Sequence, residues 1–123
     1  MANPNIVNVT SIYGNTVYLI PTGLTATAWI GLTPAAGTIN KIGTMVATNV
    51  TPTAATITVS VNNAISGGGI AYRLAWQISV PGNSSLMIID KSTSIYVGEA
   101  QSIVVTSGTS NAIEMIATYE AIS

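Results

Sequence analysis

Residues 70–80, which read IAYRLAWQISV, decide the fold because large apolar residues alternate there with smaller or polar ones. Successive side chains of a β-strand point to opposite faces of a sheet, so this alternation predicts a long strand with one apolar face. The apolar face would hold Ile70, Tyr72, Leu74, Trp76, Ile78 and Val80. We therefore expect Trp76 in the protein core and Arg73 on the opposite face of the strand.

Similar runs of β-branched and aromatic residues recur along the chain, separated by Gly, Pro, Asn and Asp residues that favour turns. They predict further strands at residues 5–13, 16–20, 42–50, 55–61, 85–89, 94–97, 101–106 and 112–121. The pair Gly14 and Asn15, between the first two of these strands, is typical of a β-hairpin turn. Residues 20–37 are less regular, with the core of a strand predicted at Trp29 and Ile30.

Eight or nine strands at this spacing, without a helix of ordinary length, predict an all-β protein. We expect a single-domain antiparallel β-sandwich over residues 1–123, with either a jelly-roll or an immunoglobulin-like topology. A chain of 123 residues can form a core without covalent cross-links, and the sequence contains no cysteine.

Charged side chains are unusually scarce, with three basic and four acidic residues and no histidine. Average proteins carry about a quarter charged residues, so Thr, Ser, Asn and Gly must cover the surface. A net charge of −1 gives a monomer little protection against association. The composition therefore favours a surface that contacts copies of the same chain or other proteins.

The same composition argues against several classes of partner. Three scattered cations cannot neutralise the phosphates of a nucleic acid or bind an anionic membrane surface. No apolar run approaches the roughly 18 residues of a spanning helix. The first residues lack the basic and apolar regions of a signal peptide, so we expect a protein made in the cytoplasm.

Side chains that carry catalysis are nearly absent. General acid–base chemistry most often uses histidine, and a nucleophilic hydroxyl needs a base beside it. The four carboxylates are Asp90, Glu99, Glu114 and Glu120, which lie mostly at the ends or on the outward faces of the predicted strands. We expect no catalytic residue, no metal site and no bound cofactor, and hence a protein that is not an enzyme.

Aromatic residues and the single arginine are the remaining candidates for contact with partners. Trp29 lies among small residues in the irregular region, where both a surface anchor and a core position fit the pattern. Arg73 would pair with a carboxylate across the sheet or across a subunit boundary, such as Glu114 or Glu120. Aromatic residues exposed on a β surface could also stack on glycans.

Three stretches carry a resemblance to a known family. They are residues 3–16 (NPNIVNVTSIYGNT), residues 71–74 with 78–86 (AYRL and ISVPGNSSL), and residues 116–123 (IATYEAIS). Together they resemble a family of small virion structural proteins of tailed bacteriophages, especially those of marine cyanobacteria. The resemblance spans essentially the whole chain and consists of sequence patterns without a catalytic motif.

The resemblance implies a virion component present in many copies and made in the host bacterial cytoplasm. Its partners would be the major capsid protein or other virion proteins, together with copies of itself. A capsid decoration (cement) protein that bridges capsomers fits a small sandwich. A neck, tail or fibre component, or a host-glycan-binding module, is the alternative. Assembly proteins often reach neighbours with extended ends, so the candidate interface residues are Trp29, Arg73, Asn3, Pro4, Asn5 and Glu120.

Overall fold

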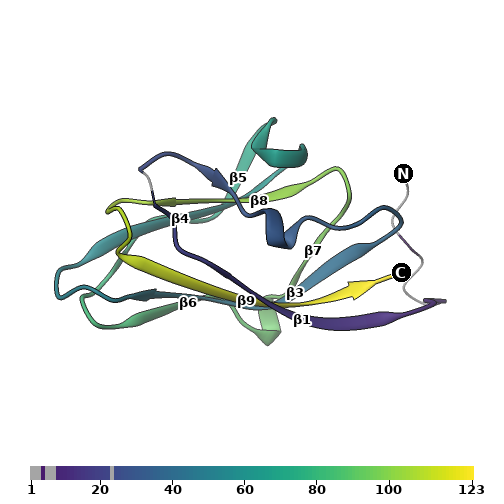
Figure 1. Cartoon of the computed structure of the whole chain (residues 1–123), viewed down its shortest axis with the longest axis horizontal. Helices are drawn as coiled ribbons and strands as arrows, with labels where there is room; N and C mark the ends of the chain where they lie inside the picture. Colours follow the sequence, from purple (N-terminus) through teal and green to yellow (C-terminus); the bar gives the residue numbers. More distant parts are fainter. Residues whose placement is uncertain (1–3, 5–7, 23) are drawn as a thin grey trace.

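The computed structural model describes residues 4, 8–22 and 24–123, and it confirms an all-β sandwich of two antiparallel sheets (Figure 1). Sheet A contains, in order, β1 (Ile12–Leu19), β9 (Ile113–Ile122), β3 (Ile39–Asn49) and β6 (Ser85–Ile89), with β7 (Ile95–Val97) also paired with β3. Sheet B contains, in order, β2 (Thr27–Ala28), β8 (Ser102–Ser107), β4 (Ala55–Asn62) and β5 (Ala71–Val80).

The order of the strands identifies the topology. β6 and β7 pair with β3 in succession, so they act as two halves of one strand interrupted by the short helix η3 (Lys91–Thr93). Counted in this way, each sheet has four strands. The chain crosses between the sheets at every connection except the one from β4 to β5. A double sheet of eight strands wound in this way is a jelly roll, which decides between the two predicted topologies.

The helices of the described chain are short. They are η1 (Ile30–Leu32), η2 (Ile65–Gly67) and η3, each of three residues. None of them has the length or the apolar character to cross a membrane.

The interior is filled by the inward-facing residues of both sheets. In β9, for example, Met115 and Ala117 face the interior while Glu114 and Ile116 face outward, as the alternation over residues 112–121 predicts. Large side chains that are fully buried include Leu32, Ile42, Met45, Ile57, Val59, Ile89, Val105, Ile113 and Met115. This interior needs no disulfide, because burial of apolar surface supplies the main driving force for folding.

A buried asparagine joins the two sheets at one end of the sandwich. Asn49, the last residue of β3, donates from Nδ2 to the carbonyl oxygens of Thr53 (2.8 Å) and Val80 (3.0 Å). Its Oδ1 accepts from the backbone N–H of Thr51 (2.9 Å). Since Val80 ends β5, this one side chain connects sheet A to sheet B. Asn62 binds the loop from β4 to β5 in a similar way.

The variant Asn49→Ala tests this connection. It leaves buried backbone groups without partners, so we expect the free energy of unfolding to fall by about 2–4 kcal/mol, as measured by chemical denaturation. The control is Asn15→Ala, which removes an exposed side chain that donates to Tyr13 alone and should change stability by less than about 0.5 kcal/mol. Equal effects of the two substitutions would contradict the structural role of Asn49.

The predicted hairpin at Gly14 and Asn15 is wrong. β1 runs without a break through both residues, which lie opposite Glu120 and Tyr119 of β9. Pairing with a ten-residue partner strand therefore overrides the local preference of Gly-Asn for a turn. The strand predicted at residues 5–13 lies partly outside the described residues, since 5–7 are not described.

The strand core predicted at Trp29 and Ile30 is displaced. The strand β2 ends at Ala28, and the residues from Ile30 form η1. The predicted strands after residue 40 are all present, with shifts of a few residues at their ends.

Candidate interaction surfaces

β5 is an edge strand whose regular alternation is broken by two β-bulges. In the described part of the chain it pairs only with β4, and the register shifts on both sides of Val59. The paired residues are Ile57 with Ile78, Val59 with Ala75, and Ser60 with Arg73. Each shift places one extra residue in β5. At the bulge between Ala75 and Ile78, Gln77 has a φ of 48° and donates its N–H to Thr58 Oγ1 at 2.9 Å.

Most of the predicted apolar face of residues 70–80 is exposed, for two reasons. Between the bulges, Ala75 pairs with the buried Val59, so its neighbours Leu74 and Trp76 face outward. Tyr72 and Ile78 pair with residues on the core side of β4 and are exposed because β5 is an edge strand. Of that face only Val80 is buried, whereas Ile70, Tyr72, Leu74, Trp76 and Ile78 are between 39% and 61% exposed. The prediction that Trp76 lies in the core is therefore wrong. Alternation assigns faces only while the register is unbroken, and one extra residue exchanges the two faces.

Arg73 and Trp76 lie against each other on this strand. The Arg73 Cζ is 4.6 Å from the centroid of the Trp76 ring, a cation–π contact worth about 0.5–1 kcal/mol at an exposed site. The prediction that the two residues occupy opposite faces is wrong for the same reason. The carboxylates predicted to pair with Arg73, Glu114 and Glu120, belong to β9 in the other sheet.

Trp29 is part of the core and not a surface anchor. It is 2% exposed, and its backbone N–H donates to the Ile103 carbonyl at 2.7 Å. The segment from β2 to η1 covers one edge of the interior, and Leu32 in η1 is buried with it. An irregular segment thus supplies large core residues, which corrects the prediction of Trp29 as an interface residue.

The two tryptophans should respond oppositely to truncation. We expect Trp29→Ala to lower the free energy of unfolding by about 3–5 kcal/mol because it opens a cavity. Trp76→Ala removes only the exposed contact with Arg73 and should cost less than about 1 kcal/mol. Denaturation by urea measures both. A large loss in the free energy of unfolding for Trp76→Ala would show that this side chain is buried in the core after all.

The outer face of sheet A carries a row of apolar side chains, which we call the apolar ridge. Its residues are Tyr18, Ile116, Val46 and Met87, which lie opposite one another across β1, β9, β3 and β6. Tyr18 is 73% exposed, Met87 55% and Ile116 47%, while Val46 is half-buried. Each strand contributes one residue, so no single stretch of sequence displays the ridge.

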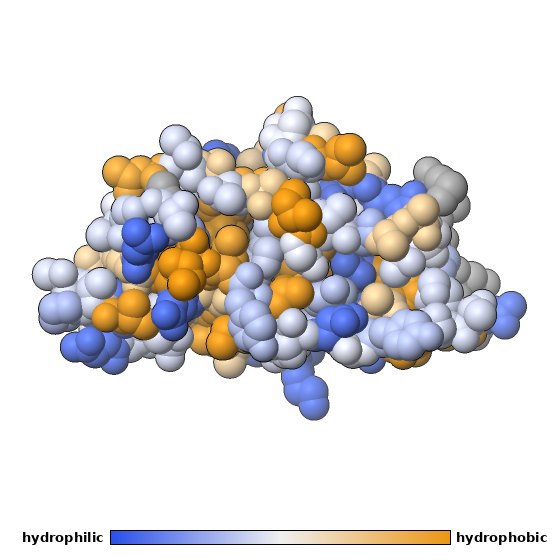
Figure 2. All heavy atoms as spheres, in the orientation of Figure 1, coloured by the Kyte–Doolittle hydropathy of each residue, from blue (hydrophilic) through white to orange (hydrophobic). Residues whose placement is uncertain are grey.

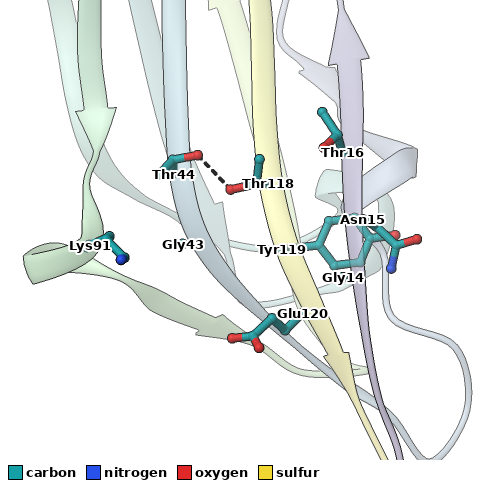
Figure 3. Close-up of a pocket in the computed structure, with 9 residues that line it drawn as sticks. All are labelled: Gly14, Asn15, Thr16, Gly43, Thr44, Lys91, Thr118, Tyr119 and Glu120. Atoms are coloured by element: carbon teal, nitrogen blue, oxygen red, sulfur yellow. Dashed lines mark hydrogen bonds between the residues drawn. The ribbon is translucent and has the colours of Figure 1, made fainter.

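Beside the ridge, smaller residues leave a hollow of about 400 Å³ (Figure 3). Its lining residues are Gly14, Asn15, Thr16, Gly43, Thr44, Lys91, Thr118, Tyr119 and Glu120. The cross-strand row next to the ridge consists of Thr16, Thr118 and Thr44. The hydroxyls of Thr44 and Thr118 share a hydrogen bond of 2.6 Å. The hollow thus has a floor of threonines.

Lys91 reaches the hollow from η3, whose turn is held by Asp90. The Asp90 Oδ1 accepts from the backbone N–H groups of Ser92 (2.9 Å) and Thr93 (3.1 Å) and from both hydroxyls. These bonds, above all the one from the Ser92 hydroxyl, lower the pKa of Asp90 below its ordinary value. The carboxylate therefore acts as a helix cap. Among the described residues, no three His, Cys, Asp or Glu side chains gather as a metal site would require.

The candidate interface residues near the two ends of the chain lie in different parts of the structure. Glu120 is exposed at the hollow, in β9, so residues 120–122 belong to the sheet and do not form an extended arm. Ser123 continues this pairing, donating its N–H to the Ser11 carbonyl at 3.0 Å. Pro4 is half-buried, and Asn3 and Asn5 lie outside the described residues.

Comparisons with known proteins give weak similarity, and only to solved structures. No family model and no curated protein sequence matches the chain. Among solved structures, a chain of the virus-like particle of the extra small virus of the giant freshwater prawn Macrobrachium rosenbergii is similar, with a TM-score of 0.40 and 15% identity. The match covers 97% of this chain and 86% of that chain. Likeness at this level leaves the function to be argued from the surfaces of the molecule.

Proposed function

We propose that the protein is a non-enzymatic structural component of a virus particle, namely a decoration protein that binds the capsid of a tailed bacteriophage and bridges capsomers. The observation that carries the proposal is the exposed apolar surface along β5, on a molecule with seven charged residues. The resemblance of three sequence stretches to phage virion proteins supports it. Jelly rolls also recur in viral capsids and in lectins, an analogy of fold that cannot assign a function alone.

The surface along β5, called here the β5 surface, consists of Leu74 and Trp76, with Arg73 against Trp76, on the outer face of sheet B. Tyr72 and Ile78 are exposed along the open edge of the same strand. Soluble monomers rarely expose large contiguous apolar patches unless these bind something. Figure 2 shows that apolar residues also reach the surface in several patches on the face it presents. Contact with a shell would remove the β5 surface from water and so stabilise both partners.

The bulges of β5 define how such a contact forms. A regular edge strand invites pairing with a strand of any other chain, and bulges are one device that prevents this. Two bulges interrupt the free edge of β5, so a partner strand cannot pair along its whole length. The side chains remain available for docking, and Trp and Arg are the types that most often dominate the energy of an interface. Trp76 and Arg73 therefore form the expected centre of the contact.

A decoration protein does not need a strong individual contact. Specific interfaces bury at least about 1,000 Å² in total, and a shell repeats the same binding position across its lattice. A molecule that bridges two capsomers gains from the high effective concentration of its second contact. The function is mechanical, since each bridge adds buried area where the shell is strained.

The test is binding to undecorated capsids of the phage that encodes the chain, measured by co-sedimentation. We expect the wild-type chain to bind and to raise the temperature at which the shells disrupt. Trp76→Ala, which should stay folded, is expected to weaken binding at least about 30-fold, the effect of a hot-spot residue. Tyr13→Ala is the control, because Tyr13 is an exposed aromatic of sheet A and should leave binding unchanged.

Other outcomes would replace the proposal. Binding to purified necks, tails or fibres and not to shells would assign the protein there. Retention on host polysaccharide that Trp76→Ala abolishes would identify a glycan-binding module, in which the Trp76 face not covered by Arg73 stacks on a sugar. Absence of binding to every virion component would overturn a structural role in the particle.

A further inference from the structure

We propose that two copies of this chain associate through the free edge of β1, so that the two β1 strands pair antiparallel and the A sheets of both copies form one continuous sheet. The inference does not rest on the proposed function, because association is a property of the purified chain. It rests on three observations: the unprotected edge of β1, the direction of its backbone groups, and the match of its side chains with a second copy of themselves.

Three of the four sheet edges in the described chain carry a feature that hinders pairing with another molecule. Short edge strands and β-bulges are two such features. In sheet B, β2 has two residues and β5 has two bulges. On the far side of sheet A, β6 and β7 have five and three residues, and η3 separates them.

β1 is the exception among these edges. It has eight residues and pairs with β9 without a register shift. Its sequence, IYGNTVYL, contains neither a proline nor a charged residue, which are two further protections of an edge. In Figure 1, β1 lies beside β9 at the border of sheet A. A long, regular and uncharged edge of this kind is a template for a further strand.

The backbone of β1 presents alternate residues to its free edge. Ser11 and Ser123, which continue the pairing of β1 with β9, exchange backbone hydrogen bonds of 2.9 and 3.0 Å. In an antiparallel ladder, pairs that exchange hydrogen bonds alternate with pairs that do not. The even-numbered residues of 12–18 therefore point their N–H and C=O groups away from β9. Within the described chain, no backbone hydrogen bond to a turn or loop involves these groups.

One symmetric register uses all of these groups. A two-fold axis perpendicular to the sheet pairs β1 with its own copy, and each residue then meets the residue equally distant from the axis. With the axis at Asn15, Ile12 of one copy lies opposite Tyr18 of the other. Gly14 lies opposite Thr16 in the same way. Asn15 meets its own copy in a pair without mutual backbone bonds, where opposed side chains are closest.

The side chains also match in this register. Ile12 is 52% exposed and Tyr18 73%, and each would cover the other on the joined sheet. A cross-strand pair of an aromatic and a β-branched residue is favourable. The two Asn15 amides can hydrogen-bond to each other, since an amide both donates and accepts. Apolar residues thus meet apolar residues at both ends of the pairing, and a polar pair lies at its centre.

The experiment is sedimentation velocity over a concentration series, together with light scattering for the mass. We expect the wild-type chain to shift from its monomer mass of 12.6 kDa to twice that value. Thr16→Pro removes an N–H that points to the free edge, a change that edge strands tolerate. Because each copy in the dimer loses a hydrogen bond, the dissociation constant should rise at least about tenfold.

Val17→Pro is the matched control for the direction of the backbone groups. The N–H of Val17 bonds to β9 in the same ladder, so this substitution removes a bond within the chain. Urea unfolding at a concentration where the chain is monomeric should show a lower midpoint for Val17→Pro than for Thr16→Pro. Equal midpoints would contradict the assignment of the free edge.

Substitutions of Asn15 test the register. Asn15→Asp and Asn15→Lys each place like charges opposite each other at the axis, so each variant alone should associate at least about tenfold more weakly. Mixed in equal amounts, the two variants should form mixed pairs in excess of the statistical proportion, as measured by native mass spectrometry. Ser79→Asp and Ser79→Lys, at an exposed position of the bulged β5, are the matched control and should show no excess.

Trp76→Ala separates this inference from the proposed function. Trp76 lies in the other sheet, so its substitution should weaken shell binding and leave the dimer intact. A wild-type chain that stays monomeric at its highest soluble concentration would overturn the inference, even if β1 then paired with a strand of another virion protein. A dimer whose Asn15 variants show no preference for mixed pairs would overturn it too, because another surface would hold that dimer.

Discussion

The structure depends on a dry interior that two sheets close around, without a cross-link and without a buried charge among the described residues. The buried polar residues are neutral, namely Asn40, Asn49, Ser60, Asn62, Ser102 and Ser107. Every fully buried side-chain nitrogen or oxygen in the described chain has a hydrogen-bond partner. Apolar side chains fill this interior, and neutral side chains such as that of Asn49 supply its hydrogen bonds, so the few charged residues all lie outside the buried core. The surfaces can therefore differ greatly in character while the core stays the same.

The sequence predicted the strands well where each strand pairs over a long, regular stretch. Residues 55–59 and 113–117 alternate as expected because β4 and β9 lie in the middle of their sheets with neighbours on both sides. The prediction of the faces of β5 was wrong because these faces depend on two bulges against β4. The positive φ of Gln77 at one bulge has no local cause in the sequence. Strand order could not be predicted either, because alternation reveals that strands exist and not which of them are neighbours.

The candidate surfaces were harder to predict than the fold. Glu120 was a candidate through its position near the chain end, and it lies at the hollow because β9 carries it there. The ridge could not be found, since its four residues come from four strands and meet only through register. One sign was available in the sequence. Gly14 lies within a run of β-forming residues, and an isolated glycine in such a run indicates a bulge or the approach of another backbone.

The short helix η3, between β6 and β7, keeps its shape through its own hydrogen bonds and not through packing against the core. The turn of η3 is closed by hydrogen bonds among its own residues, Asp90 to Thr93, and it contains no buried side chain. Lys91 therefore projects from a unit whose shape does not depend on it. Substitution there can alter the chemistry of the neighbouring face and leave the folding of the sandwich untouched. In a lineage of such chains, partner preference can diverge at this one turn while the sandwich beneath it is conserved.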